Sequence, residues 1–277
     1  MSSRVTVATL REMKAKGERI TMLTAYDALV ARAVDAAGVD VILVGDSLGE
    51  VVQGHDSTLP VRLRETLYHT EIVARCVRRA LVVADMPFLS YGVTVEATVR
   101  HAGLCVKEAG AAAVKLEGGA LRAEEVRRLA DCGIPVMGHV GTLPSWIHRY
   151  GAYRVQGKTL EAGRAILEDA LALEAAGAFA VVIEVVPPGL ARVITRRLSI
   201  PTIGIGAGPH CDGQVLVTQD MLGFDTGRST RFVRRYETLG ARMAEAISRY
   251  AAEVREGRFP DATTSYSDGD VDWGSLE

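Results

Sequence analysis

Four carboxylates stand at or near the ends of short apolar runs in this sequence, where buried strands would end. They are Asp46 after VILVG, Asp85 after LVVA, Glu117 in AVKLEGG and Glu184 after AVVI. Acids that converge on one pocket repel one another unless a cation balances them. Oxygen ligands suit a hard ion, and Mg²⁺ is the usual partner of a few carboxylates plus water or substrate. The acids therefore predict a magnesium site, whereas zinc would need more histidine or cysteine than this pocket offers.

A lysine and a histidine occupy matching positions. Lys115 and Glu117 are two residues apart, so on a strand their side chains point the same way, and His139 follows the apolar run PVMG. Each residue also has a structural interpretation. Asp46 and Asp85 could cap the helices that follow them. Lys115 could be only a partner of Glu117, and His139 could be a satisfied core histidine.

The elements that would position these side chains recur along the chain. Four helix-like stretches end in a glycine that suits a left-handed cap, and a short β-rich run follows each one. These glycines are Gly38, Gly110, Gly133 and Gly177. The pattern predicts strands at residues 20–24, 39–44, 81–84, 112–116, 135–139, 179–184, 201–206 and 214–218. Continuous apolar runs are typical of parallel strands that are covered on both faces.

Repeated strand–helix units in 277 residues predict one closed (β/α)8 TIM barrel of the α/β class. An open doubly wound sheet is the alternative, but the first strand runs into TAYD and not into a glycine-rich fingerprint. In a barrel the active site lies where the strands end, so the residues at the strand ends would share one mouth.

Several segments fall outside the repeat. Residues 141–159 form a long connection that contains Trp146 and Tyr150, and such loops are often lids. Residues 232–254 predict a long final helix. We assign residues 1–256 to the catalytic barrel domain and residues 257–277, which are polar and acidic, to a flexible C-terminal tail.

Composition limits the classes of partner and compartment. The net charge is −2, so no overall basic field recruits nucleic acid or an anionic membrane. No apolar run approaches the roughly 20 residues that span a bilayer, and the N-terminus lacks the apolar segment of a signal peptide. The four cysteines are widely spaced, with no CxxC pair. These features predict a cytoplasmic enzyme without nucleic-acid or membrane partners.

A series of motifs resembles the ketopantoate hydroxymethyltransferase family, in the family's order and across about residues 20–225. They are TAYD at 24–27, VGDSLG at 44–49, HDSTLPV at 55–61, YHT at 68–70, ADMPF at 84–88, VKLEGG at 114–119, GHVG at 138–141, YRVQGKT at 153–159, IEVVP at 183–187, IGIGAG at 203–208 and CDGQVLV at 211–217. Several are long and unusual in combination, so the resemblance is specific.

The resemblance implies a barrel of the phosphoenolpyruvate/pyruvate type and a homo-oligomer, with a decamer expected. It implies Mg²⁺-dependent transfer of a hydroxymethyl group from the co-substrate methylenetetrahydrofolate to 2-oxoisovalerate (3-methyl-2-oxobutanoate). The product would be ketopantoate, an intermediate of pantothenate biosynthesis.

The resemblance also implies roles for single residues. Metal contacts would come from Asp46, Asp85 and Glu117, and Glu184 would be the catalytic proton acceptor. The residues implied in substrate binding are Asp46, Ser47, Asp85, Lys115 and His139, the last as the histidine of the family's GH motif.

Two stretches depart from the family pattern. The family usually reads GHLGLTPQ where this chain reads GHVGTLPSWIHR at 138–149, within the expected lid. It usually has an LGYDSTLPV-like run where this chain has VQGHDSTLPV at 52–61. Neither departure falls on an implied site residue, but the first leaves the folate contacts less defined than the core chemistry.

Two other functions remain as alternatives. One is another metal-dependent C–C bond lyase or mutase of the same barrel group, although the KKCGH-type run of those enzymes is absent from the sequence. The other is a non-catalytic barrel, which would be expected to lack some of the acids at strand ends.

Overall fold

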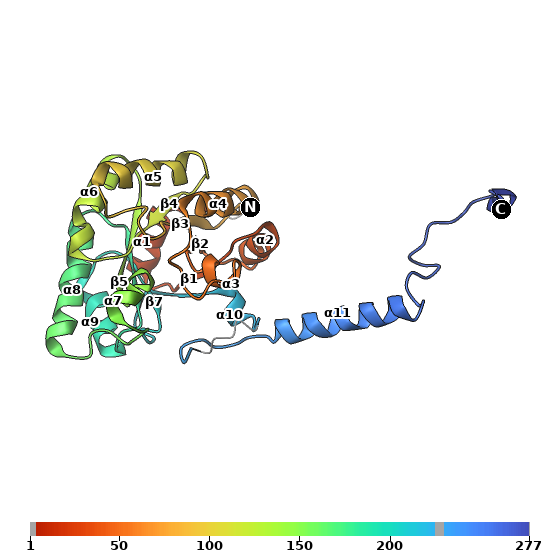
Figure 1. Cartoon of the computed structure of the whole chain (residues 1–277). Helices are drawn as coiled ribbons and strands as arrows, with labels where there is room; N and C mark the ends of the chain where they lie inside the picture. Colours follow the sequence, from red (N-terminus) through yellow and green to blue (C-terminus); the bar gives the residue numbers. More distant parts are fainter. Residues whose placement is uncertain (1–3, 225–229, 277) are drawn as a thin grey trace.

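Short strands pair in sequence order, and the last pairs with the first, so that a closed parallel barrel forms (Figure 1). The computed structural model describes residues 4–224 and 230–276. The strands are β1 (Ile20–Thr24), β2 (Val41–Val44), β3 (Leu81–Asp85), β4 (Ala113–Lys115), β5 (Val136–Gly141), β6 (Ala180–Glu184), β7 (Thr202–Ile205) and β8 (Gly213–Leu216). The predicted TIM barrel is confirmed, and each predicted strand end lies within two residues of the observed one.

Helices connect most of the successive strands and pack on the outer face of the barrel, but none lies between β7 and β8 (Figure 1). They are α1 (Val7–Lys16), α2 (Ala28–Ala36), α3 (Leu48–Val51), α4 (Leu63–Cys76), α5 (Val95–Lys107), α6 (Ala123–Asp131), α7 (Ile147–Tyr150), α8 (Leu160–Ala175) and α9 (Pro188–Arg197), followed by α10 (Thr218–Met221) and α11 (Leu239–Arg255). The four predicted cap glycines, Gly38, Gly110, Gly133 and Gly177, all have left-handed φ, between 76° and 103°. A left-handed residue turns the chain out of each helix and toward the next strand.

Side chains alternate along each strand between the barrel interior and the surrounding helices. Met22, Leu43, Val83, Met137 and Val182 belong to one buried cluster that fills the interior. Leu10 of α1 is fully buried in the same cluster, so α1 closes the end of the barrel where the strands begin. The opposite end, where the strands finish, is the mouth.

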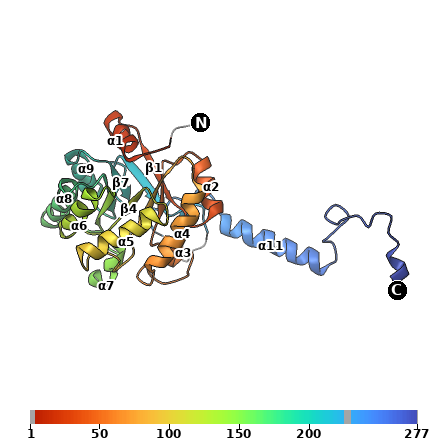
Figure 2. The same ribbon diagram turned by 90° about the horizontal axis from the view of Figure 1, so that it is seen from above.

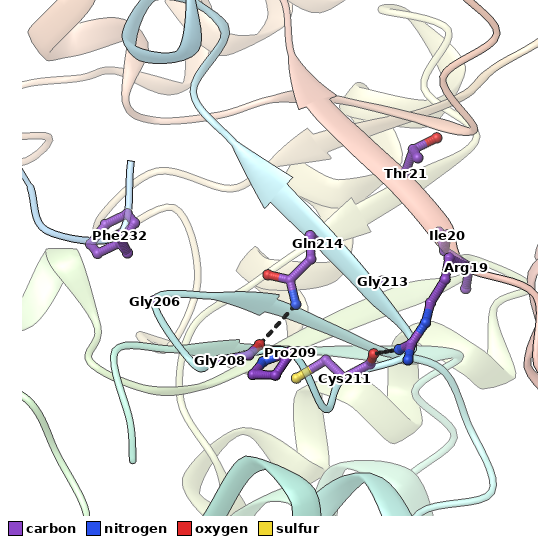
Figure 3. Close-up of a pocket in the computed structure, with 10 residues that line it drawn as sticks. All are labelled: Arg19, Ile20, Thr21, Gly206, Gly208, Pro209, Cys211, Gly213, Gln214 and Phe232. Carbon is purple, nitrogen blue, oxygen red and sulfur yellow. Dashed lines mark hydrogen bonds between the residues drawn. The ribbon is translucent and has the colours of Figure 1, made fainter. Parts of the chain in front are cut away.

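The outer face next to β8 lacks a helix of ordinary length. The helix after β8, α10, has only four residues. A groove of about 690 Å³ lies beside β1 and β8, and Figure 3 shows Gln214 and Phe232 among its lining residues. Thr21 and Gln214 are the exposed residues of these two strands. The barrel is therefore closed by its strands but is not fully covered by its helices.

The predicted final helix starts later than expected. Helix α11 begins at Leu239 rather than near Phe232, so the first part of that prediction was wrong. The backbone N–H groups of Tyr236 and Leu239 donate to the carbonyls of Met221 and Leu222, at 2.8 and 2.9 Å. These hydrogen bonds hold the segment in a non-helical path along the end of α10.

Helix α11 projects away from the barrel, and the chain beyond it extends farther still (Figures 1 and 2). No residue of α11 is buried. Beyond it, residues 257–276 are exposed and irregular apart from one short 3₁₀ turn at Trp273–Leu276. The assignment of residues 1–256 to one domain and of the remainder to a flexible tail stays a prediction.

Two further features bear on the compartment. Cys76, Cys105, Cys132 and Cys211 all carry free thiols. Across residues 4–224 and 230–276, no helix has the length and apolar character needed to cross a membrane. The cytoplasmic location stays a prediction.

Candidate active site

A buried ion pair lies in the mouth of the barrel. Asp85, at the end of β3, is the register partner of Lys115 on β4. The Lys115 ammonium donates to both carboxylate oxygens of Asp85, each at 2.7 Å. Both residues are less than 5% exposed. Each belongs to the interior-facing set of its strand, because Val83 and Ala113, two residues earlier, are members of the interior cluster.

More negative than positive charge is buried around this pair. Burial raises the pKa of Asp85 to about 7, with Lys115 opposing the shift and Asp46 adding to it. Burial and then Asp46 raise the pKa of Glu117 to about 8, again against Lys115. Burial alone would lower the pKa of Lys115, but the attraction of Asp85, Glu117 and Asp46 outweighs it and leaves the ammonium charged. The pocket therefore favours the entry of either protons or another cation.

Asp46 and Ser47 lie in the turn after β2. Asp46 is 8% exposed, and Ser47 precedes α3 without making a side-chain cap. The Ser47 hydroxyl is 2.8 Å from the hydroxyl of Tyr26. Neither predicted acid is a helix cap, because the N-cap of α3 after Asp46 is Ser47 and the N-cap of α5 after Asp85 is Thr94. The helix-cap interpretation of Asp46 and Asp85 is therefore wrong.

His139 and Glu184 face each other across β5 and β6. The Nε2 atom of His139 lies 3.2 Å from Glu184 Oε2, and its Nδ1 atom lies 3.7 Å from Glu117 Oε1. Neither contact has hydrogen-bond geometry, and both ring nitrogens are buried without a partner. Burial, reinforced by Lys115, holds the pKa of His139 well below its usual value, so the ring is neutral. His139 is not a satisfied core histidine, and its orphaned nitrogens are suited to binding a ligand.

Glu184 ends β6 and is poised to exchange protons near neutral pH. Burial raises its pKa to about 7, and the positive charge of Lys115 opposes the shift. The residue after it, Val185, has a left-handed φ of 47°, which a β-branched residue rarely adopts. The Val185 N–H donates to the carbonyl of Ile205 at 2.8 Å. A strained but hydrogen-bonded backbone at this point is typical of a functional site.

Two residues of the mouth were not predicted from the sequence. The Tyr91 hydroxyl accepts a hydrogen bond from the Glu117 N–H at 3.2 Å. Ser145 donates from both its backbone N–H and its hydroxyl to Glu117 Oε2. Both residues lie in loops, where no periodic pattern marks them, and only the departure from the family motif at 138–149 drew attention to Ser145.

Three acids of the mouth have the donor atoms that a hard metal ion needs. Asp46, Asp85 and Glu117 offer only oxygen atoms, and the pKa values of Asp85 and Glu117 are raised partly by the surrounding acids. Within the part of the chain that the structure describes, no three His, Cys, Asp or Glu side chains are arranged as a metal-binding group. Mg²⁺ usually keeps several waters and takes only one or two protein carboxylates, so oxygen donors of this kind suit it without a full set of protein ligands.

The mouth can therefore support one kind of chemistry well. It holds a carboxylate with a near-neutral pKa (Glu184), a neutral imidazole (His139) and a charged ammonium (Lys115) in a buried space. A base of this kind removes protons from weak carbon acids, and nearby positive charge stabilises the anion that results.

Comparison with known proteins places the chain in a family. The family model described as ketopantoate hydroxymethyltransferase matches residues 4–262. The 3-methyl-2-oxobutanoate hydroxymethyltransferase of Geobacter metallireducens is 52% identical, covering 96% of this chain and all of that protein. The protein of the same name from Syntrophomonas wolfei is 51% identical, covering 93% of this chain and 94% of its own.

Solved structures with the same fold are more distant in sequence. A putative phosphonomutase from Burkholderia cenocepacia is 17% identical, with a TM-score of 0.60 over 91% of this chain and 99% of its own. A 2,3-dimethylmalate lyase, of the PEP mutase/isocitrate lyase superfamily, is 17% identical, with a TM-score of 0.56 over 98% of this chain and 94% of its own. These likenesses establish the barrel architecture alone.

The buried ion pair gives a prediction about stability. We expect Lys115→Met to lower the free energy of unfolding at pH 8 by about 3–5 kcal/mol, because Asp85 would remain buried without its cation. The loss should shrink as the pH falls from 8 to 5. A carboxyl whose pKa is raised by folding binds more protons in the folded state than in the unfolded state. The folded protein therefore loses stability as the pH rises from the unfolded pKa to the folded pKa. Urea denaturation followed by circular dichroism measures both effects.

The matched control for that variant is Lys16→Met. Lys16 forms a 4.0 Å pair with Glu12 in which both side chains are more than 60% exposed. Its loss should leave the stability nearly unchanged at either pH. Equal, pH-independent losses in the two variants would rule out a special role for the Lys115–Asp85 pair.

Proposed function

The chain belongs to the ketopantoate hydroxymethyltransferase family, and we propose that its barrel mouth transfers a hydroxymethyl group from methylenetetrahydrofolate to 2-oxoisovalerate (3-methyl-2-oxobutanoate). The family match covers nearly the whole chain, and relatives that are about half identical carry the name of this activity. The product is ketopantoate, and the reaction belongs to pantothenate biosynthesis.

The observation that carries the proposal is the position and pKa of Glu184. The reaction must remove a proton from C3 of the 2-oxo acid, a tertiary carbon next to a ketone and therefore a weak acid. A carboxylate with a pKa of about 7 is a stronger base than an ordinary glutamate, and about half of it is ionised at neutral pH. We therefore propose that Glu184 is the base that accepts the C3 proton.

The neighbouring residues bind and orient the substrate. The Lys115 ammonium and the Ser47 hydroxyl would hold the substrate carboxylate and the oxygen on which negative charge develops. His139, neutral and 3.2 Å from Glu184, would donate or accept one hydrogen bond beside the reacting carbon. Asp46, Asp85 and Glu117 would hold Mg²⁺, which when bound supplies Lewis acidity toward the keto oxygen.

The proposed reaction replaces the hydrogen on C3 of the 2-oxo acid by a hydroxymethyl group. The C3–H bond breaks and its proton passes to Glu184. A new C–C bond joins C3 to the methylene carbon, and the bonds from that carbon to tetrahydrofolate nitrogen break. Water supplies the hydroxyl group of the product, and tetrahydrofolate leaves. The overall change consumes the 2-oxo acid, methylenetetrahydrofolate and water.

The alternatives are less well supported. The mutase and lyase structures that share the fold are only 16–17% identical to this chain, against 50–52% for the hydroxymethyltransferases. A non-catalytic barrel would have no need for three buried acids in its mouth, Asp46, Asp85 and Glu117, because burying them costs stability. Hydroxymethyl transfer therefore explains both the residues and the resemblance.

We also propose that the chain forms a homo-oligomer through α11, with a decamer expected from the family. The helix carries an exposed apolar stripe at spacings of four, three and four residues, made of Met243, Ile247, Tyr250 and Val254. Such a stripe on a projecting helix is unfavourable in water unless it packs against another surface. The groove beside β1 and β8 (Figure 3) lies on a face of the barrel where the helix after β8, α10, has only four residues. A second copy of the chain is the partner that this geometry suits.

One assay tests the proposed reaction directly. Purified protein with 2-oxoisovalerate, methylenetetrahydrofolate and Mg²⁺ should yield ketopantoate and tetrahydrofolate, measured by mass spectrometry. Omitting the folate should abolish the product. A chelator should also abolish it, and added Mg²⁺ should restore it, because three carboxylates and one lysine leave the mouth short of positive charge. Product formation that does not depend on folate would refute the proposed donor.

The assignment of the base is tested by Glu184→Gln. This variant should still bind the 2-oxo acid and Mg²⁺ but exchange the C3 proton for deuterium at least about 100-fold more slowly. In the unmodified protein the exchange rate should rise with pH and level off above about 7, because only ionised Glu184 accepts a proton. Nuclear magnetic resonance of the substrate follows the exchange. Glu168→Gln, on the exposed side of α8, is the control, and unimpaired exchange in Glu184→Gln would eliminate Glu184 as the base.

The oligomer is tested on the stripe of α11. Replacing Met243 and Ile247 together by glutamate should reduce the particle mass measured by multi-angle light scattering, because charged groups cannot be buried in an apolar contact. Arg249→Ala, which changes an exposed residue paired with Glu245 on the same helix, should leave the mass unchanged. A monomeric unmodified protein, or an unaffected mass in the double variant, would contradict the proposed contact.

A further inference from the structure

The loop between β5 and α8 contacts one of the proposed metal-binding acids directly. This loop, residues 142–159, is called here the β5 loop. It contains a 3₁₀ turn at Pro144–Trp146, and Ser145 in that turn is only 6% exposed. The Ser145 N–H donates to Glu117 Oε2 at 3.1 Å, and the Ser145 hydroxyl donates to the same oxygen. A loop residue thus supplies two hydrogen bonds to a carboxylate of the barrel.

These two hydrogen bonds leave the carboxylate asymmetric. Oε2 is occupied by both Ser145 donors, whereas Oε1 is 3.7 Å from the nearest His139 nitrogen, beyond hydrogen-bond distance. Among the described residues no donor reaches Oε1 within hydrogen-bond distance. Hydrogen bonds that hold one oxygen of a carboxylate in place also set the direction in which the other oxygen points. Hydrogen-bond donors of this kind orient metal ligands in proteins.

The same loop is also attached to the proposed base. The Thr142 N–H donates to the carbonyl of Glu184 at 2.9 Å, and the Gln156 N–H donates to the carbonyl of Val185 at 3.0 Å. The Thr142 hydroxyl donates to the carbonyl of Arg154 at 2.8 Å, which links the two ends of the loop. The β5 loop therefore bridges Glu117 on one side of the mouth and the end of β6 on the other.

We propose that Ser145 is a positioning residue that turns Glu117 toward the divalent cation, and that cation binding in turn holds the β5 loop against the mouth. The inference rests on the proposed cation site. If the loop contact favours cation binding, then bound cation must favour the loop contact by the same factor. Ser145 lies in the stretch that departs from the family motif, so this coupling is a property of this chain's own residues.

The chain carries a natural reporter of this coupling. Trp146 follows Ser145, is half-buried, and stacks with the Arg149 guanidinium 4.4 Å from its ring centre. The chain has two tryptophans, and the other, Trp273, is 56% exposed in the C-terminal segment. Trp273→Phe therefore leaves a single fluorescent residue, located in the β5 loop.

The first measurement is the Mg²⁺ affinity of the full chain by isothermal titration calorimetry. Ser145→Ala should bind Mg²⁺ roughly tenfold more weakly, the lower end of the effect seen when a partner of a metal ligand is removed. Ser145→Thr, which keeps the hydroxyl, should recover most of the affinity. His148→Ala, an exposed change in the same loop, should bind as the unmodified protein does.

The second measurement is Trp146 emission during Mg²⁺ titration in the Trp273→Phe background. Emission should change with Mg²⁺ in that protein, and Ser145→Ala should shift the midpoint to higher Mg²⁺ by the factor found by calorimetry. Circular dichroism checks that each variant is folded.

Three outcomes would overturn the inference. Equal Mg²⁺ affinity in Ser145→Ala and the unmodified protein would refute the role of Ser145 and leave the cation site standing. An unchanged Trp146 emission despite measured Mg²⁺ binding would refute the coupling to the loop. No Mg²⁺ binding by the unmodified protein would refute the proposed cation site and the inference together.

Discussion

The charge balance around Lys115 is the constraint on which the rest of the mouth depends. One ammonium, hydrogen-bonded to both oxygens of Asp85, is buried among Asp46, Asp85, Glu117 and Glu184. A single positive charge cannot satisfy four acids, so the remaining acids either take up protons or attract another cation. The raised pKa of Glu117 reflects this deficit together with burial, whereas burial alone raises the pKa of Glu184.

The apolar interior of the barrel stabilises the fold despite the excess of buried negative charge in the mouth. Its interior is filled below the mouth by an apolar cluster that includes Leu10, Met137 and Val182, and α1 closes the far end. The acids therefore lie at the mouth end of this cluster, where the β5 loop places Ser145 against Glu117. The stability of the barrel comes from its apolar layers, which leaves the mouth free to hold charges that destabilise it.

Much of this arrangement could be predicted from residue patterns, because strands and their ends have strong signals. Asp85, Lys115 and Glu184 stand at the ends of apolar runs, and the period of two placed Lys115 and Glu117 on one side. Ser145 and Tyr91 could not be found in this way, since loop positions follow no period and their contacts join distant parts of the chain. The start of α11 was misplaced because backbone hydrogen bonds to α10, which no local pattern encodes, replace the expected helical turns.

The alternation on β4 also bears on how this protein can change in evolution. Ala113 packs in the interior and Lys115 ion-pairs with Asp85, whereas Val114 and Leu116 pack among the helices outside. Substitutions here alter one side chain, but inserting or deleting a single residue would exchange the two faces, sending the ammonium into the apolar layer and valine into the mouth. Insertions and deletions are therefore tolerated in the loops and not in the strands. The middle of the β5 loop is exposed, so a change of length there would alter the edge of the mouth without exchanging the two faces of a strand.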